Sequence, residues 1–268
     1  MAAGLLIVNP RAGGARPDAG ELEAEARRRR GIDVHVLAAG DDAAAIAREA
    51  DAPALGMAGG DGSIGPVVEV ALERDLPFVC VPFGTRNHFA RDAGLDRDEP
   101  FAALDAFDGG REQRIDVGRV NGRAFLNNVS LGLYARLVHH REDRRRRREA
   151  LARLRALALL VTDRHPVRLR IGDEQVEARV VLVANNAYAL DLFSIGERER
   201  LDEGLLHVYV PESLLPHEWL DRTCERLTIE SPRPRVRAAI DGEPAELESP
   251  IELSIEPGAL RLLLPEQR

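Results

Sequence analysis

One glycine-rich loop carries residues of the kind that bind phosphate together with a metal ion. The loop is Gly59-Gly60-Asp61-Gly62-Ser63, which follows an apolar run and precedes a helical pattern. Its glycines allow the backbone to approach an anion closely, and the N-terminus of the following helix adds partial positive charge. An aspartate inside such a loop suits a metal ion bound to the same anion. The segment therefore predicts a phosphate-and-magnesium loop, with a plain tight turn as the alternative.

Two further loops have a similar character. Residues 82–91 (Pro-Phe-Gly-Thr-Arg-Asn-His-Phe-Ala-Arg) follow the next apolar run, and residues 8–14 (Val-Asn-Pro-Arg-Ala-Gly-Gly) follow the first. Loops at the carboxyl ends of neighbouring strands line one crevice, where ligands bind in open α/β sheets. Arg11 could meet a phosphate there. His88 is a candidate general base, although histidine in the first turn of a helix is more often a surface or packing residue.

A fourth segment, Ile240-Asp241-Gly242-Glu243, lies between two strand-like runs. Asp-Gly is a common signal for a two-residue hairpin turn, because both residues tolerate positive φ. Taken alone, the segment favours this structural interpretation, and only its combination with the three loops changes the balance. Asn121-Gly122 gives the same turn signal between two other runs.

The elements that must position these loops differ between the two halves of the chain. Residues 1–120 alternate short apolar runs with helical patterns, which is typical of a parallel sheet flanked by helices. The expected strands are Leu5–Val8, Asp33–Leu37, Ala54–Ala58 and Phe78–Val81, and the expected helices are Glu21–Arg30, Asp42–Glu49 and Val67–Arg74. We therefore predict an α/β domain over residues 1–120.

Residues 121–268 are predicted to form a β-sandwich interrupted by one long helix at residues 135–162. Alternating patterns from just before this boundary onward predict strands at Arg114–Val120, Arg123–Val129, Val167–Ile171, Val176–Val183, Leu205–Val210, Arg235–Ile240 and Ile251–Ile255. Within the helix, residues 136–155 contain nine arginines against three acidic residues. Two interpretations stay open for this stretch, namely a solvated helix face and a patch that docks on anionic lipid headgroups.

The composition excludes several classes of protein. The formal net charge of -8 argues against a general nucleic-acid binder. All 37 basic residues are arginine, which excludes a P-loop lysine, a protein-kinase lysine and Schiff-base chemistry. No apolar run reaches the ~20 residues of a membrane span, and the N-terminus lacks the charged region of a signal peptide. Cys80 and Cys224, the latter after an expected helix, form no disulfide or metal pattern, so we expect a cytoplasmic protein.

Six segments, taken in order, resemble the diacylglycerol kinase catalytic family, which includes soluble bacterial lipid kinases and sphingosine kinases. They are NPRAGG, GGDGS, PFGTRNHFAR, RIDVGRVNGRAFLNNVSLG, LDEGLLHVYV and AAIDGEP. GGDG alone is shared with NAD kinases and phosphofructokinases, whereas the set of six is highly specific. The resemblance implies an N-terminal α/β domain with a parallel sheet, an all-β, sandwich-like C-terminal domain for the lipid acceptor, and an ATP site in the cleft between them.

The resemblance also implies roles for individual residues. Asp61 and Asp116 would hold the magnesium of ATP directly or through water, and Glu203 would belong to a second, structural metal site. The general base would be Asp241 or Glu243. The implied nucleotide-binding residues are Asn9, Pro10, Arg11, Ala12, Gly13, Gly59, Gly60, Asp61, Gly62, Ser63, Gly84, Thr85 and Asn87.

Several positions depart from the family pattern. Ser63 replaces threonine, Gly65-Pro66 replaces Asn-Glu, Ala38-Ala39 replaces a nucleotide-binding threonine, and His88 and Glu203 each replace an aspartate. Two alternatives therefore stand beside an ATP- and magnesium-dependent lipid kinase: an NAD kinase-like enzyme and a catalytically weak, lipid-binding regulatory protein. The expected partner is a lipid at an anionic membrane surface, bound peripherally, with no nucleic acid and with a homodimer as an open option.

Overall fold

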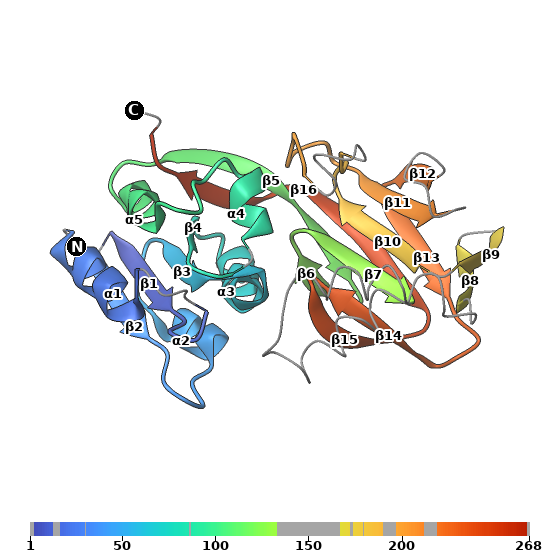
Figure 1. Ribbon diagram of the computed structural model, residues 1–268, viewed down its shortest axis with the longest axis horizontal. Coiled ribbons are helices and arrows are strands. Elements are labelled where there is room, and N and C mark those ends of the chain that lie inside the picture. Colours follow the sequence, from blue (N-terminus) through green and yellow to red (C-terminus); the bar gives the residue numbers. More distant parts are fainter. Residues whose placement is uncertain are drawn as a thin grey trace. The chain divides into compact units, whose positions relative to one another are not determined.

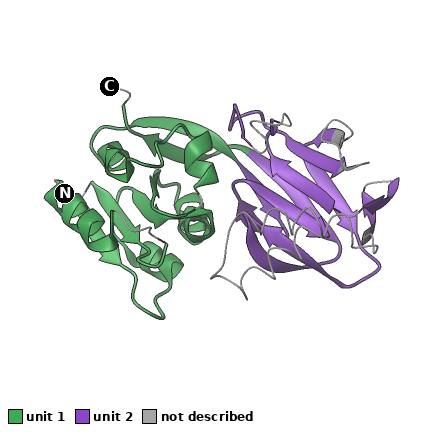
Figure 2. Ribbon diagram, in the orientation of Figure 1, with its two compact units in different colours: residues 1–116, 257–268 green, residues 117–256 purple. Residues whose placement is uncertain are grey.

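The computed structural model describes residues 3–12, 17–29, 31–85, 87–132, 167–171, 174–178, 180–189, 197–211 and 219–266. The chain divides into two compact units, unit 1 with Met1–Asp116 and Pro257–Arg268, and unit 2 with Val117–Glu256 (Figure 2). The predicted division at residue 120 differs from these units at the C-terminus, because the last strand of the chain returns to unit 1. The helix predicted at residues 135–162 lies outside the described residues.

Unit 1 is built around a parallel sheet, as predicted. Its strands β1 (Gly4–Val8), β2 (Ile32–Val36), β3 (Leu55–Gly59) and β4 (Phe78–Pro82) lie in the order β2-β1-β3-β4 (Figure 1). The end of β16 (Ile251–Leu264) pairs in parallel with β4. Every residue of β1, β3 and β4 is buried, which explains why these strands appear in the sequence as continuous apolar runs.

Helices cover both faces of this sheet. α1 (Ala19–Arg28) contacts α5 (Pro100–Ala103) on one face, where the 3₁₀-helix η1 (Leu104–Phe107) also follows, and α2 (Ala43–Glu49) contacts α3 (Asp61–Glu73) on the other. The side chains of Asp18 and Asp42 cap the N-termini of α1 and α2. α3 begins earlier than predicted and includes Pro66. The short helix α4 (His88–Asp92) follows β4 and begins at His88, which was expected in the first turn of a helix.

Unit 2 is an antiparallel β-sandwich, which confirms the predicted class. One layer has the strand order β12-β11-β10-β7-β14-β15, and the other contains β9, β8 and β13 with the unit 2 parts of β16 and β5, and β6. Val129, Val183, Ile229 and Ile251, from both layers, are buried in the core between them. The bounds are β5 (Arg111–Val120), β6 (Arg123–Phe125), β7 (Asn128–Gly132), β8 (Val167–Ile171), β9 (Glu174–Ala178), β10 (Val180–Asn185), β11 (Leu206–Pro211), β12 (Trp219–Cys224), β13 (Arg226–Glu230), β14 (Arg235–Ile240) and β15 (Glu243–Glu248).

Both predicted hairpin turns are present. Asn121 and Gly122 have φ values of 46° and 82° between β5 and β6, and Asp241 and Gly242 have φ values of 49° and 80° between β14 and β15. Positive φ at both central positions is the geometry that Asn-Gly and Asp-Gly favour.

Some predicted elements in unit 2 were wrong in extent or type. The single strands predicted at Arg123–Val129 and Val176–Val183 are each divided in two, into β6 and β7 and into β9 and β10. The helix expected before Cys224 is wrong, because Cys224 is the last residue of strand β12. Strands β13 and β15 were not predicted.

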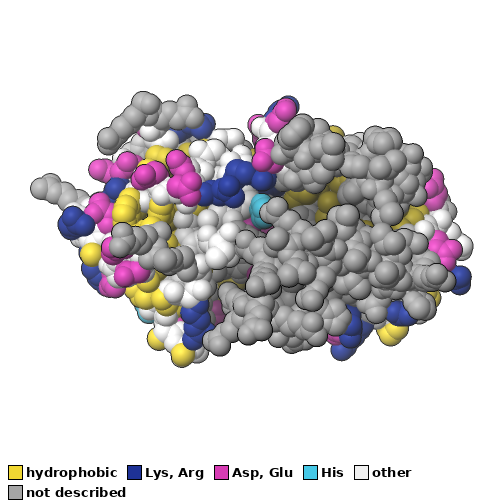
Figure 3. Space-filling view, viewed as in Figure 1, with side chains coloured by type: hydrophobic (Ala, Val, Ile, Leu, Met, Phe, Trp, Pro, Cys, Tyr) yellow, Lys and Arg dark blue, Asp and Glu magenta, His cyan; other side chains and the backbone are white. Residues whose placement is uncertain are grey.

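Charged and hydrophobic side chains are mixed on one face of the described surface. On the face drawn in Figure 3, acidic and basic side chains lie interspersed over the described residues. The acidic excess is therefore not gathered in one described area of that face. None of the described helices has the length and hydrophobicity that crossing a membrane requires.

Candidate active site

The strand order of unit 1 creates a switch point between β1 and β3. From β1 the chain passes outward to β2 and then returns across β1 to β3, so that the connections after β1 and β3 turn to opposite faces of the sheet. Ligands of open α/β sheets bind outside the carboxyl ends of the strands at such a point. The loops predicted to bind phosphate are the ones that follow β1 and β3, with the β4 loop beside them.

A side-chain hydrogen bond joins the loops on the two sides of the switch point. Asn9 Nδ2 donates to Ser63 Oγ at 2.9 Å, and Asn9 Oδ1 accepts the backbone N–H of Arg11 at 3.0 Å. Pro10 and Arg11 are exposed beside this bond, and Ala12 N–H donates to the Asn9 carbonyl. The structure therefore brings the predicted first loop into contact with the second. Gly13 lies outside the described residues.

Glycines allow the loops after β3 and β4 to touch. A Cβ atom added at Gly84 would lie 2.3 Å from the Cα of Gly60, so one of the two loops would have to move. Asn87 fixes the second loop, since its Oδ1 accepts the Gly84 N–H at 3.0 Å and its Nδ2 donates to the Gly84 carbonyl at 2.8 Å. Thr85 is exposed between them. The start of α3 thus lies beside the start of α4.

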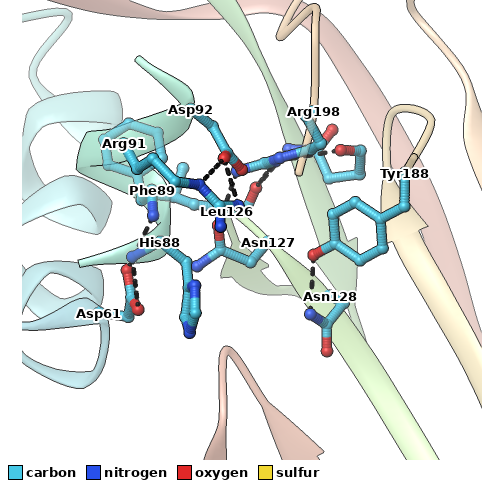
Figure 4. Close-up of polar contacts among 11 residues, drawn as sticks. Asp61, His88, Phe89, Arg91, Asp92, Leu126, Asn127, Asn128, Tyr188 and Arg198 are labelled. Atoms are coloured by element: carbon cyan, nitrogen blue, oxygen red, sulfur yellow. Dashed lines mark hydrogen bonds and ion pairs between the residues drawn. The ribbon is translucent and has the colours of Figure 1, made fainter. Parts of the chain in front are cut away.

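Asp61 links the starts of these two helices. It is the first residue of α3 and is 8% exposed. Its Oδ2 accepts the backbone N–H of His88 at 3.1 Å, and its Oδ1 accepts that of Phe89 at 3.0 Å (Figure 4). These amides belong to the first turn of α4, where no partner exists within the helix. Asp61 therefore has a structural role that the sequence did not suggest, and its predicted contact with magnesium stays a prediction. The side chain of His88 is exposed.

The predicted metal ligands occupy two different settings. Asp116, on β5, is 2% exposed, and its Oδ1 accepts the Gly258 N–H at 2.8 Å. Glu203 belongs to unit 2, where its Oε2 accepts the Ala187 N–H at 2.7 Å and lies 3.4 Å from His207 Nε2. Within the part of the chain that the structure describes, no three His, Cys, Asp or Glu side chains form a group that could hold a metal ion.

Asp241 anchors a segment of unit 2 with its carboxylate. Its Oδ2 accepts the N–H of Leu126 at 2.8 Å, and its Oδ1 accepts the N–H groups of Asn127 at 2.7 Å and Asn128 at 3.0 Å. The Asp241 N–H in turn donates to the Asn128 carbonyl at 2.9 Å. The β14–β15 turn is thereby tied to the junction of β6 and β7, so Asp241 does more than adopt a turn conformation. Glu243, the other candidate base, is exposed at the start of β15.

Sequence reasoning missed a buried arginine that contacts the same segment. Arg198 is 5% exposed, and its guanidinium donates to the carbonyl of Leu126 at 2.5 Å, to that of Asn185 at 3.1 Å and to Asn127 Oδ1 at 2.6 Å (Figure 4). In the sequence it stands in the charged stretch Gly-Glu-Arg-Glu-Arg, which is typical of an exposed loop. No signal in that stretch distinguishes Arg198 from its neighbours.

The thiol of Cys80 is excluded as a nucleophile by its surroundings. Cys80 lies on β4 and is 3% exposed. Burial, and secondly the negative charge of Asp61, raise the pKa of this thiol well above its ordinary value. The reactive thiolate form is therefore suppressed at neutral pH.

Known proteins resemble this chain in sequence and fold. Residues 3–120 match the diacylglycerol kinase catalytic domain. A diacylglycerol kinase of Mycobacterium tuberculosis is 29% identical over 298 residues, covering 97% of this chain and 94% of that protein. A probable lipid kinase, YegS-like, of Pseudomonas aeruginosa is 29% identical over 289 residues with the same coverage. The crystal structure of a putative diacylglycerol kinase from Bacillus anthracis str. Sterne has the same fold, with a TM-score of 0.73 at 19% identity over 98% of this chain and 96% of that one.

Proposed function

We propose that this chain transfers the γ-phosphate of ATP to a lipid hydroxyl such as that of diacylglycerol. The premise is that the chain belongs to the diacylglycerol kinase catalytic-domain family and is a lipid kinase. The observation that carries the proposal is the Asn9–Ser63 hydrogen bond, which joins two phosphate-type loops at the switch point of the sheet. Phosphoryl transfer requires alignment and charge neutralisation more than covalent chemistry, and this arrangement suits those tasks.

The nucleotide phosphates are proposed to bind at the loops after β1, β3 and β4. Gly60 and Gly62 have no side chains to cover their backbone amides, and the N-terminus of the 13-residue helix α3 favours an anion. The linked side chains of Asn9 and Ser63 would orient the bound phosphates. Because the chain has no lysine, these amides and the exposed Arg11 would offset the phosphate charge.

The carboxylates of Asp61 and Asp116 are proposed to hold the magnesium ion of ATP, directly or through water. Both are buried and both accept backbone N–H groups, which fixes the direction of their oxygens. Oxygen donors of this type are the ligands that magnesium prefers. When bound, magnesium would neutralise charge on the transferred phosphate. Glu203 is proposed for a second, structural ion, separate from this one.

Removal of the proton from the lipid hydroxyl is assigned to Asp241 or Glu243. A general base needs a carboxylate held within reach of the hydroxyl. Three backbone amides fix the direction of the Asp241 carboxylate, whereas Glu243 is exposed. This ordered geometry favours Asp241 as the base, with Glu243 as the alternative.

We also propose that the lipid is met at an anionic membrane surface, with the chain bound peripherally on the cytoplasmic side. The support is the excess of six positive charges in residues 136–155. This whole stretch lies outside the residues that the structure describes. Each such charge is worth ~1 kcal/mol near an anionic surface. Replacing Arg144, Arg145, Arg146, Arg147 and Arg148 by glutamine should weaken salt-sensitive sedimentation with anionic vesicles. Equal binding by the two proteins would contradict the proposal.

Radiolabelled ATP tests the proposed activity and its alternatives together. The purified chain is incubated with ATP, magnesium and micelles that contain diacylglycerol, phosphatidylglycerol, a sphingoid base or an isoprenoid alcohol, with NAD in a parallel reaction. We expect one lipid to be labelled and labelling to stop without magnesium. Labelled NADP instead would support the NAD kinase-like alternative. Lipid binding without any transfer would support a regulatory protein.

A further inference from the structure

The backbone segment Leu126–Asn128 is held from both sides. Its three N–H groups donate to the Asp241 carboxylate. Its carbonyl groups accept from other residues: that of Leu126 from Arg198 and from Asn185 Nδ2 at 3.1 Å, and that of Asn127 from the Asn185 N–H at 3.0 Å. A segment fixed in this way has little freedom to change the direction of the carboxylate that it binds.

One peptide group connects Arg198 directly with Asp241. The carbonyl of Leu126 and the N–H of Asn127 belong to the same peptide unit, so Arg198 donates to one end and Asp241 accepts from the other. The two hydrogen bonds measure 2.5 and 2.7 Å. Hydrogen bonds at opposite ends of a peptide group polarise each other, and the effect is larger in a buried, low-dielectric setting. The bond from Asn127 is also the shortest of the three that Asp241 accepts.

A buried arginine is a costly way to fill space. Removing a guanidinium from water costs several kcal/mol unless its donors are satisfied, and apolar residues of similar volume often stabilise a protein equally well. The planar fork of Arg198 instead meets two carbonyls and the Asn127 side chain at the same time. The guanidinium is therefore held in one direction by acceptors from three residues.

We infer that Arg198 is a positioning residue for the kinase reaction, because it fixes the peptide group that orients the Asp241 carboxylate. The inference rests on the proposed function in taking Asp241 as the base. Arg198 needs no contact with substrate or nucleotide for this role. Its effect should therefore appear in the rate of transfer and not in the binding of ATP, whose proposed loops belong to unit 1.

Kinetics of Arg198→Gln give the first test. We expect kcat to fall by about 10²-fold, the size of effect known for small misplacements of a reacting group, while the KM for ATP changes by less than about twofold. Arg198→Lys keeps the charge with a smaller donor set and should recover part of kcat. The matched control is Arg200→Gln, since Arg200 is 63% exposed in the same stretch and pairs with Asp202. Its kcat should equal that of the wild type.

Backbone amide NMR gives a second test that needs no activity. In Arg198→Gln the amide proton of Asn127 should move upfield more than those of Leu126 and Asn128, because its peptide group loses the guanidinium. Wild-type kcat in the folded variant, or an unmoved Asn127 signal, would overturn the inference. If Arg198→Gln does not fold, Arg198→Lys decides by the same two measurements. A wild-type chain that labels no lipid would overturn the proposed function instead, and the amide signals alone would then decide whether Arg198 orients this peptide group.

Discussion

Replacing Asp241 by asparagine perturbs the anchor and the proposed base in one step. Asparagine tolerates the φ of 49° and suits a turn before Gly242, so the hairpin itself should persist. The change removes the negative charge and converts one carboxylate oxygen into an N–H donor. Because Oδ1 accepts two amides and Oδ2 accepts one, we expect the remaining oxygen to stay with Asn127 and Asn128. The new NH₂ group would then face the N–H of Leu126.

The structure gives a magnitude for this loss. A hydrogen bond to a charged group contributes ~1.5–3 kcal/mol, and the two remaining bonds should each weaken by about 0.5 kcal/mol when the charge is lost. Asp241 is half-buried, so the lower values apply, and the free energy of unfolding should fall by about 2–3 kcal/mol. For a unit of this size the Tm should fall by about 4–12 °C. If Asp241 only formed the turn and its carboxylate held no backbone amides, the substitution would leave the free energy of unfolding almost unchanged.

Catalysis is then measured well below the lowered Tm, on the lipid that the radiolabelled assay identifies. If Asp241 is the base, kcat should fall by about 10²–10⁴-fold in the folded variant. An unchanged Tm would contradict the stabilising role of the three hydrogen bonds that the Asp241 carboxylate accepts. Near-normal kcat together with an inactive Glu243→Gln variant would move the base to Glu243, and normal kcat in both variants would refute the assignment altogether.

Three further predictions test unit 1. Asp61→Asn should abolish transfer and lower the Tm, because the amide keeps one oxygen for the two N–H groups at the start of α4; a folded, active variant would refute the metal assignment. Gly84→Ala should lower the free energy of unfolding, measured with urea, by about 1–3 kcal/mol, because the added Cβ would collide with Gly60. The control Gly65→Ala has open space around the added Cβ, so it should leave this free energy unchanged or raise it. Equal losses in the two variants would contradict the prediction. The hydrogen bond from Arg261 lowers the pKa of Glu112 below 4.5. Glu112→Gln should therefore be less stable than the wild type at pH 7 and equally stable once the pH falls through the lowered pKa. A difference in stability that does not change with pH would contradict this prediction.

The α/β half was predictable because its signals are local. Fully buried strands such as β1 and β4 appear as apolar runs, and each ends at a loop with glycine or proline. Two hairpin turns, at Asn121-Gly122 and Asp241-Gly242, were predictable because these residue pairs tolerate positive φ. Helix α3 was predicted to start too late, because it begins at Asp61, inside the glycine-rich loop, where the sequence indicated a loop.

The elements and contacts that were missed depend on the tertiary structure. β15 contains Pro244 and several glutamates, a composition with low β propensity that is acceptable because β15 is an edge strand. The burial of Arg198 and the three amides on Asp241 join residues more than seventy positions apart. No spacing rule predicts such contacts. The sequence therefore placed Asp241 in a turn, and the resemblance made it a candidate base, without showing how it is held.

The return of β16 to unit 1 affects how this chain can fold during synthesis. Leu262 and Leu263 pair with Phe78 and Val79 of β4, and Leu262 is fully buried there. Until they leave the ribosome, the edge of β4 is open to pairing with other nascent chains. Domains usually fold in the order in which they are synthesised. Here all of unit 2 emerges before unit 1 can close, so residues 3–120, which match the catalytic domain, would leave the ribosome as an unfinished sheet.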